Sequence, residues 1–277
     1  MRNSIGPLFT IALLATIAGA DNKCSWTEEV PQIKTTPVRP LARTEIVCHD
    51  HIMVLYDKTI DFPFATYAVH TKEQMHELLG GRKSFVPDPV IPLDEQHLNN
   101  DTIFHAPYSR GHLTPSHIMS YDKSYGGAWE ETYYMSNILP QLALFNEGAW
   151  EKFEANIVDE LSDQPDGTVW EIYTGGLWNS NYAKTIGRGK GDEPAKDYLF
   201  WKAFCDRKHC NSGMITALHH ENVTRWDVRP VNILLPGLFT ECCPDNDVLY
   251  QWKTLLNGVT ETDDNNSSKN NGFIIVN

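Results

Sequence analysis

Short apolar and β-branched runs, separated by polar turns, predict a strand-rich chain with few helices. Strands are expected at residues 44–56, 62–69, 131–138, 168–173, 198–204, 214–218 and 231–235. The strongest helical pattern spans residues 142–161, where Trp150, Phe153, Ile157 and Leu161 recur on one face. Shorter helices are expected at residues 72–79 and 245–256. The pattern predicts one α+β domain with a mixed or antiparallel central sheet flanked by helices.

The N-terminal residues have the pattern of a secretory signal peptide at residues 1–20. Arg2 precedes an apolar stretch at residues 8–17, and small residues close it at Ala18-Gly19-Ala20. We therefore expect an exported protein, with no other segment apolar enough to cross a membrane. An irregular arm would follow at residues 21–44, then the main domain at 45–259 and a polar tail at 260–277.

Cysteine usage agrees with export, because all six cysteines follow the predicted signal peptide. They are Cys24, Cys48, Cys205, Cys210, Cys242 and Cys243. An even number in an exported chain favours disulfide bonds over a zinc site, and adjacent Cys242 and Cys243 are expected to bond to different partners. Possible glycan acceptors are Asn100, Asn222 and the overlapping sequons at Asn265 and Asn266.

The charge balance limits the kind of nucleic-acid protein that this chain can be. The formal net charge is −13, with 36 acidic and 23 basic residues. Proteins that package nucleic acid neutralise many phosphates, so this balance argues against such a role. An enzyme needs only a local positive groove, and the charge does not exclude one.

Two residues suit metal-assisted hydrolysis of a phosphodiester. His112 follows Arg110-Gly111, and a histidine near neutral pH can take a proton from water while the neighbouring arginine meets phosphate. The alternative is an ordinary histidine, of which the chain has ten others. Asn146 offers a neutral amide oxygen to Mg²⁺, although asparagine is also a common helix cap.

Glu154 lies eight residues after Asn146, at the edge of the apolar stripe of the predicted helix. A carboxylate in that position needs a partner. Metal-bound water would provide one, and a salt bridge to a lysine or arginine would provide another; the pattern favours neither.

Taken together, four segments resemble the DNA/RNA non-specific endonuclease family, the ββα-metal or His-Me finger nucleases that include mitochondrial endonuclease G. The resemblance covers roughly residues 45–240, with weaker similarity at residues 169–177 and at Trp201-Lys202. The four segments are Ser109-Arg110-Gly111-His112-Leu113, Ser136-Asn137-Ile138-Leu139-Pro140-Gln141, Asn146-Glu147-Gly148-Ala149-Trp150 and Phe153-Glu154.

The resemblance implies a ββα-metal motif and a role for each matching residue. His112 would be the general base, and Asn146 would hold one Mg²⁺, with Mn²⁺ as an alternative ion. Asn137 would support the geometry of both, and Glu154 would fix metal-bound water. Two arginines would meet phosphate. They are Arg110 and, further upstream, Arg82, for which Lys83 is the alternative.

These roles imply an Mg²⁺-dependent endonuclease that cleaves DNA and RNA and leaves 5′-phosphate ends. Two departures from the family pattern support a different hypothesis, a catalytically weak secreted binding protein with the nuclease fold. Ser109 replaces the usual aspartate, and Val158 stands where some members carry an arginine. Phosphate contacts would then come from Arg110, Lys123 or Lys152. An esterase is disfavoured because no Gly-x-Ser-x-Gly segment is present. The sequence leaves strand preference and oligomeric state open.

Overall fold

The computed structural model describes most of the chain between residues 24 and 259. The described residues are 24–29, 31, 43–76, 83–120, 128–177, 199–219, 226–229, 231, 235, 237–239, 242, 252, 254–257 and 259. The predicted signal peptide and C-terminal tail lie outside them, as does Arg82. Within the described parts, no helix is long and apolar enough to cross a bilayer.

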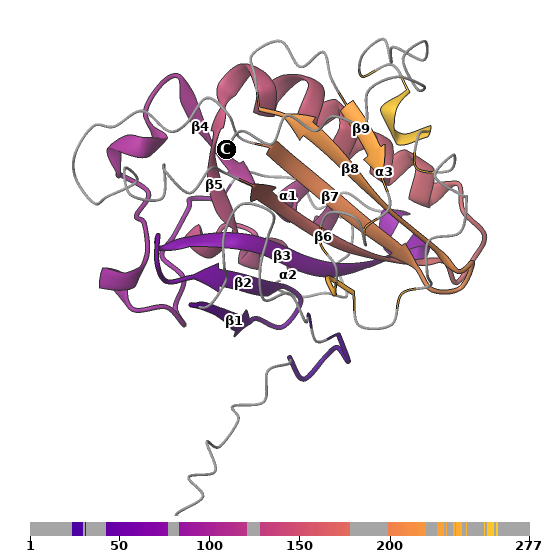
Figure 1. The fold of residues 1–277 in the computed structure, drawn as a ribbon, viewed down its shortest axis with the longest axis horizontal. Coiled ribbons are helices and arrows are strands. Elements are labelled where there is room, and N and C mark those ends of the chain that lie inside the picture. The colour runs from indigo at the N-terminus through magenta and orange to yellow at the C-terminus, as the bar shows by residue number, and fades with distance from the viewer. Residues whose placement is uncertain are drawn as a thin grey trace, which may run out of the picture.

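A seven-stranded sheet forms the centre of the protein (Figure 1). Its strands lie in the order β1-β2-β3-β6-β7-β8-β9, and every neighbouring pair is antiparallel. The strands are β1 (Thr44–Cys48), β2 (Met53–Asp57), β3 (Phe62–Thr71), β6 (Val169–Leu177), β7 (Leu199–Asp206), β8 (Asn211–Leu218) and β9 (Trp226–Arg229). Most of these segments match the predicted strands, and the α+β class is confirmed.

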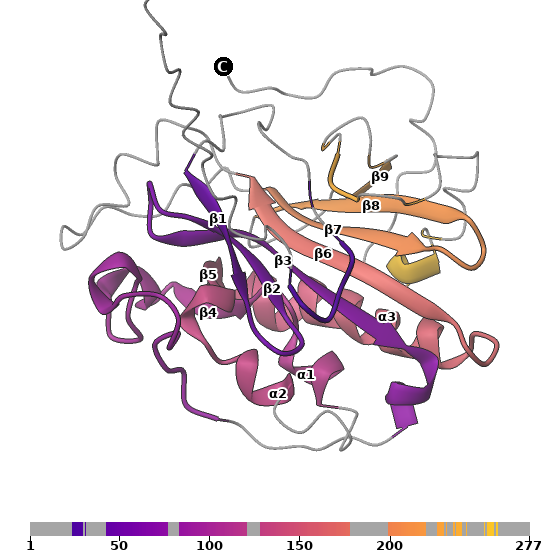
Figure 2. The same ribbon diagram turned by 90° about the horizontal axis from the view of Figure 1, so that it is seen from below.

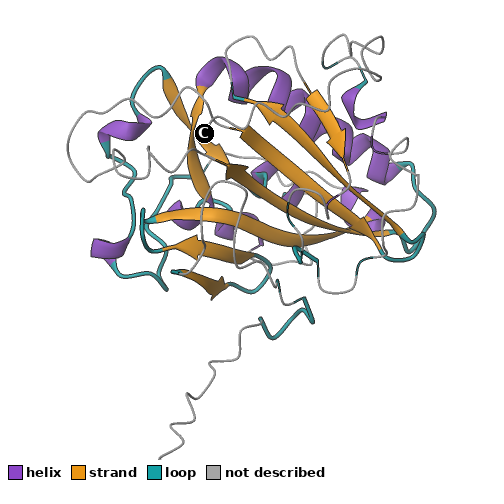
Figure 3. Ribbon diagram, in the orientation of Figure 1, coloured by secondary structure: helices purple, strands orange, loops and turns teal. Residues whose placement is uncertain are grey.

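A separate two-stranded hairpin, β4 (Tyr108–His112) with β5 (Ile138–Leu142), precedes the main helix. In the parts of the chain that the structure describes, the α-helices with defined bounds are α1 (Ser116–Met119), α2 (Ala128–Glu131) and α3 (Glu151–Ser162). Figure 2 shows the hairpin and all three helices on the same side of the large sheet. Figure 3 shows the same division by element type, with loops connecting the layers. Strand, strand and helix therefore follow one another in the segment that the motifs span.

The apolar stripe of α3 explains why this helix packs on the sheet. Trp150, Phe153, Ile157 and Leu161 are fully buried, in one cluster with Trp170 of β6 and aromatic residues of β7. The helix begins later than predicted, because residues Phe145–Trp150 form a π-helical turn with Gly148 outside helical geometry. A second cluster covers the opposite face of the sheet and includes Tyr67, Tyr173 and Trp201.

The strand predicted at residues 131–138 is wrong. Its residues form consecutive turns, with the amide of Tyr133 donating to Glu130 and that of Asn137 donating to Tyr134. The hydroxyl of Thr132 donates to the carbonyl of Trp129, a local bond that competes with strand pairing. The Thr- and Tyr-rich composition therefore misled the prediction, and only Ile138 belongs to β5.

Disulfides are present, as predicted. Cys24 bonds to Cys48 and Cys205 bonds to Cys242, so Cys242 does not pair with its neighbour in sequence. Cys210 is also disulfide-bonded. The first bond ties residues 24–29 to β1, and the second ties Cys242 to β7. The zinc alternative does not fit Cys205, Cys210 and Cys242, because a sulfur held in a disulfide is not a thiolate ligand.

Candidate active site

The chain that follows His112 is held in place by Asn137. The Oδ1 atom of Asn137 accepts a hydrogen bond from the amide of Thr114 at 2.8 Å, and its Nδ2 donates to the carbonyls of Thr114 and Thr132 at 2.9 and 2.8 Å. The Asn137 carbonyl also accepts from the amide of Leu113. This buried amide therefore fixes the turn after His112.

The imidazole of His112 lies between two aromatic rings, with centroids 5.3 Å from Phe85 and 5.1 Å from Tyr133. Its Nε2 atom is shielded from solvent and has no hydrogen-bond partner among the described residues. Burial lowers the pKa of His112 to about 4. The ring is therefore neutral at physiological pH, and a shielded nitrogen is left to accept a proton.

Arg110 lies on the same side of β4 as His112, because side chains alternate along a strand. Its guanidinium lies 5.4 Å from the ring of Phe104 and 5.9 Å from that of Phe85. The Nη2 atom donates to the carbonyl of Asn99, and Nε is shielded without a partner among the described residues. Phe85 thus contacts both Arg110 and His112 and fixes their relative position.

The other side of β4 carries Ser109 and Gly111. A Cβ atom on Gly111 would lie 2.1 Å from the side chain of Gln141, so only glycine fits beside this glutamine. The hydroxyl of Ser109 donates to the Gln141 carbonyl at 3.3 Å and accepts from Asn146 Nδ2 at 3.1 Å. The residue that replaces the family aspartate therefore contacts the expected metal ligand.

Described contacts place His112 with Phe85 and Tyr133, and Asn146 with Ser109; none of them joins His112 to Asn146. The bond to Ser109 uses the Nδ2 of Asn146 and not its Oδ1, and the Gln141 side-chain amide is shielded without a partner among the described residues. No three histidine, cysteine, aspartate or glutamate side chains cluster in the described parts. A mostly hydrated Mg²⁺ needs few protein ligands, so a free amide oxygen fits the expected ion.

Glu154 forms an ion pair with Lys202 of β7, with 3.0 Å between Oε1 and Nζ. Lys202 is completely buried and also donates to the carbonyl of Leu113 at 3.1 Å and to Thr174 Oγ1 at 2.9 Å. Burial raises the pKa of Glu154, an effect that Lys202 opposes, and burial lowers the pKa of Lys202. Of the two partners considered for Glu154, the structure shows the salt bridge. The pair connects α3 to the residue after His112.

Sequence reasoning gave Lys202 only a weak similarity to the family. A stronger signal was available, because it is the single charged residue within the apolar run 199–205. A charge in a buried strand requires an opposite charge and hydrogen-bond acceptors. That requirement pointed to a carboxylate on the neighbouring helix, where Glu154 lies at the edge of the stripe.

Asp88 is a second buried group that the sequence analysis did not single out. It accepts hydrogen bonds from Ser136 Oγ and from His49 Nε2, the latter at 2.9 Å. Burial alone would raise the pKa of Asp88, but bonds from His49 and Ser136 lower it. This cluster fixes Ser136 beside Asn137.

Lys83, the alternative to Arg82, pairs with Glu130 and lies 5.0 Å from the ring of Trp129.

The sequence of this chain is similar to that of a known protein family. Residues 35–247 match the sequence profile of the DNA/RNA non-specific endonucleases. The chain belongs to this family. Human mitochondrial nuclease EXOG is 31% identical over 116 residues, which are 42% of this chain and 30% of that protein. Mitochondrial nuclease 1 of Schizosaccharomyces pombe is 33% identical over 105 residues, or 37% and 31% of the two chains.

A zebrafish mitochondrial nuclease EXOG is 39% identical over 92 residues, covering 32% of this chain and 24% of that protein. The matched segment therefore spans about a third or less of the curated relatives. A chain in the crystal structure of the EndoG/EndoGI complex superposes with a TM-score of 0.48 and 19% identity, covering 69% of this chain and 79% of that one.

Proposed function

We propose that this chain is a secreted endonuclease that hydrolyses phosphodiester bonds of DNA and RNA, with His112 as general base. The observation that carries the proposal is the state of His112, a neutral imidazole on a turn fixed by Asn137, whose shielded Nε2 has no hydrogen-bond partner among the described residues. A proton acceptor for water requires such a free nitrogen in a fixed position. Family membership supplies the substrate class, and the disulfides agree with export.

In this mechanism, Nε2 of His112 removes a proton from water as the oxygen attacks phosphorus. Lys202 and Asn137 keep the turn in place through Leu113 and Thr114, so the imidazole does not have to reorganise. Arg110 would place its remaining guanidinium donors toward phosphate. Asn146 would hold Mg²⁺ through Oδ1, and the chemistry supplied there would be the offset of negative charge at the phosphate and at the leaving 3′-oxygen; the products would carry 5′-phosphates.

Two variants at histidine positions test the general base. Purified protein is incubated with supercoiled plasmid and with RNA, in Mg²⁺ and then with chelator. We expect metal-dependent cleavage of both substrates, and a loss of at least about 100-fold in His112→Ala. His117→Ala is the matched control, since His117 is exposed on α1 five residues later. Equal activity in both variants would disprove the role of His112.

A separate measurement tests whether Asn146 and His112 share one ion. Paramagnetic Mn²⁺ broadens the NMR signals of nearby nuclei, so we expect it to broaden the His112 ring protons in the wild-type protein. The effect should be lost in Asn146→Ala. Broadening that leaves His112 untouched while affecting Asn146 would show that the two residues do not serve the same ion, whatever the activity.

The alternative function, a weakly catalytic binding protein, has one structural argument in its favour. Val158 is buried against the core and offers no charge to a substrate where some relatives carry an arginine. A gel-shift assay with a plasmid fragment in Mg²⁺ separates the two functions. Stable complexes without cleavage would support the binder and reject the endonuclease.

A further inference from the structure

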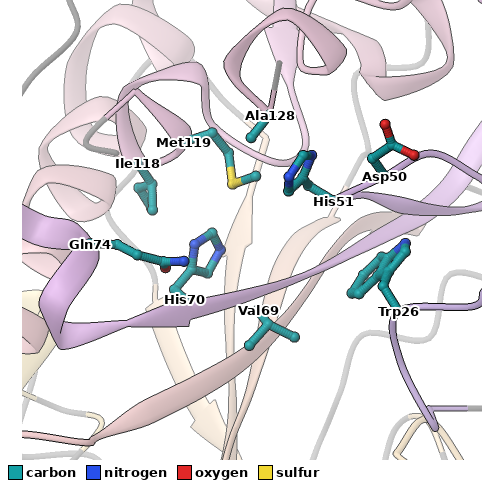
Figure 4. Close-up of a pocket in the computed structure, with 9 residues that line it drawn as sticks. All are labelled: Trp26, Asp50, His51, Val69, His70, Gln74, Ile118, Met119 and Ala128. Carbon is teal, nitrogen blue, oxygen red and sulfur yellow. The ribbon is translucent and has the colours of Figure 1, made fainter. Parts of the chain in front are cut away.

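A cavity of about 250 Å³ lies at the end of β3 and is lined by none of the residues assigned to the candidate active site. β3 continues to Thr71, but its neighbour β2 stops opposite Tyr67, so the last residues of β3 have no strand on that side. The turn containing Asp50 and His51 and the helices α1 and α2 enclose the space (Figure 4). Side chains of α1 and α2 give it apolar walls, from Ile118, Met119 and Ala128.

Two buried polar side chains line the cavity without a partner for part of their hydrogen-bonding capacity. His70 is 2% exposed, and its backbone pairs with Trp170 of β6 while its imidazole lines the cavity. Gln74 is 7% exposed; its Oε1 accepts from the amide of Thr71 at 2.7 Å, and its NH₂ group has no partner among the described residues. Figure 4 shows both side chains on the same side of the cavity. Neither side chain is among the fully shielded groups of the described residues, so these donors and acceptors face the cavity and can bond to a ligand or to water.

The surroundings select a neutral ligand. Burial lowers the pKa of His70 to about 3, and the charge of Lys202 adds to the effect, so the ring is neutral and has one donor and one acceptor nitrogen. An anion would also face the carboxylate of Asp50, which lines the cavity. Glu131 accepts hydrogen bonds from the amides of Asp50 and His51, at 3.2 and 3.0 Å, and this fixes the shape of the turn. The wall of the cavity that Asp50 and His51 provide is therefore held in place.

The size and shape of the cavity narrow the class of ligand further. An apolar cavity of about 150 Å³ is enough to hold benzene. The larger volume here accommodates one substituted ring or two fused rings. The Met119 thioether suits contact with a ring edge. Beside these walls, the Gln74 NH₂ can donate to a ligand acceptor while His70 accepts from a ligand N–H. A ligand that complements these two side chains carries a hydrogen-bond donor next to an acceptor on one edge of a flat heterocycle.

We propose that this cavity binds a small, neutral, planar heterocycle with an amide-like edge, of the size and chemistry of a free nucleobase, through His70 and Gln74. The site is separate from the His112 turn and does not depend on the proposed hydrolysis. Phosphorylated nucleotides would be excluded by their charge, so the ligand is a free base or a similar cyclic amide.

Calorimetric titration with uracil and adenine tests the proposal, with toluene as an apolar probe and adenosine 5′-monophosphate as an anionic one. We expect saturable binding of at least one base, and affinity for toluene and the nucleotide at least tenfold weaker. His70→Leu and Gln74→Leu should each reduce base affinity at least tenfold, because they keep bulk and remove hydrogen bonds. His117→Leu is the matched control on the surface of α1, and circular dichroism checks the fold of each variant.

A second pair of measurements locates the bound base. Ala128→Leu should abolish binding by filling the cavity, whereas His112→Ala should leave binding unchanged. A crystal soaked with the bound base should show it between His70 and Met119. Binding lost in His112→Ala but kept in His70→Leu would assign the base to the active site and overturn the proposal. Equal affinity for toluene, or no binding of any base, would overturn it as well, leaving a cavity that holds water only.

Discussion

Lys202 and Glu154 form an ion pair that connects the central sheet to the helix of the candidate site, with 3.0 Å between Nζ and Oε1. The same ammonium group donates to the carbonyl of Leu113, directly after His112. One buried charge therefore fixes the relative position of the general-base turn and the carboxylate on α3. Neither residue could hold this position alone, because each would leave an uncompensated buried charge.

Replacement of Lys202 by methionine tests this relationship. We expect Lys202→Met to lower the free energy of unfolding by about 3–5 kcal/mol, because Glu154 then lies largely buried without its partner. Activity should fall as well, since the Leu113 carbonyl loses its donor. Urea denaturation and plasmid cleavage measure the two effects.

The double variant Lys202→Met/Glu154→Gln separates charge from position. It should recover most of the lost stability without recovering cleavage. Lys208→Met is the matched control, since Lys208 is exposed two positions after the end of β7. If the single variant cleaves normally, Lys202 is structural only.

Gly111 and Gln141 provide a test of close packing in the hairpin. A methyl group at Gly111 would collide with the Gln141 side chain, so Gly111→Ala should destabilise the protein by about 1–3 kcal/mol. The double variant Gly111→Ala/Gln141→Ala removes the collision and should regain much of that loss. Thermal denaturation of the four proteins in this cycle gives the coupling between the two positions. If the effects of the two substitutions on stability are additive, the hairpin relaxes around the added methyl group. Glycine would then be needed at this position for its backbone conformation and not for the close contact with Gln141.

The state of His112 changes the expected dependence of activity on pH. Free histidine titrates near pH ~6.5, which would place the acid limb of the rate profile there. Burial lowers the pKa of His112 to about 4, so the neutral base persists into more acidic solution. At pH 5 about nine-tenths of a group with a pKa near 4 is neutral, against about 3% of free histidine. A kcat/KM profile that declines already near pH 6.5 would contradict the shielded environment of the ring.

Buried His70 makes acid stability depend on an identifiable residue. Its folded-state pKa of about 3 lies below the unfolded value near ~6.5, so the unfolded chain binds the extra proton between these values. Stability from this group is present above pH ~6.5 and is lost as pH falls toward 3, by up to about 1.4 kcal/mol per pH unit. His70→Leu should flatten that dependence in urea denaturation measured across the interval. An unchanged slope would show that another group controls acid unfolding.

Local chemistry predicted the candidate site better than it predicted the connections that hold it. The α3 stripe follows from helical spacing and the glycine before His112 from short-range sterics, whereas the Asn137 segment was recognisable only through its resemblance to the family. The Lys202–Glu154 pair joins residues 48 positions apart, so the lone charge in an apolar strand indicates that a partner is needed, but no periodic pattern identifies that partner. The same limit applies to Asp88, which bonds to His49 and Ser136 from segments distant in sequence.

Prediction from the sequence was also wrong where the composition favours a strand but local hydrogen bonds favour turns. Residues 131–138 are rich in strand-forming side chains, yet local bonds such as that from Thr132 Oγ1 to Trp129 hold them in turns. Those turns place Tyr133 against His112 and Asn137 under Thr114. The irregular backbone is thus the part that positions the site, and no regular pattern describes it.

Ser109 offers a last test, because it replaces the aspartate usual in the family and touches Asn146. Its neutral hydroxyl accepts the Asn146 NH₂ at 3.1 Å, an orientation that leaves the amide oxygen available for a cation. A carboxylate at this position would accept the same bond more strongly and add negative charge near the ion. We therefore expect Ser109→Asp to lower the Mg²⁺ concentration needed for half-maximal cleavage several-fold. Ser109→Ala should raise it, because Asn146 loses its acceptor. Mg²⁺ titrations of plasmid cleavage measure both shifts, and identical half-saturation in the three proteins would show that position 109 does not influence the ion.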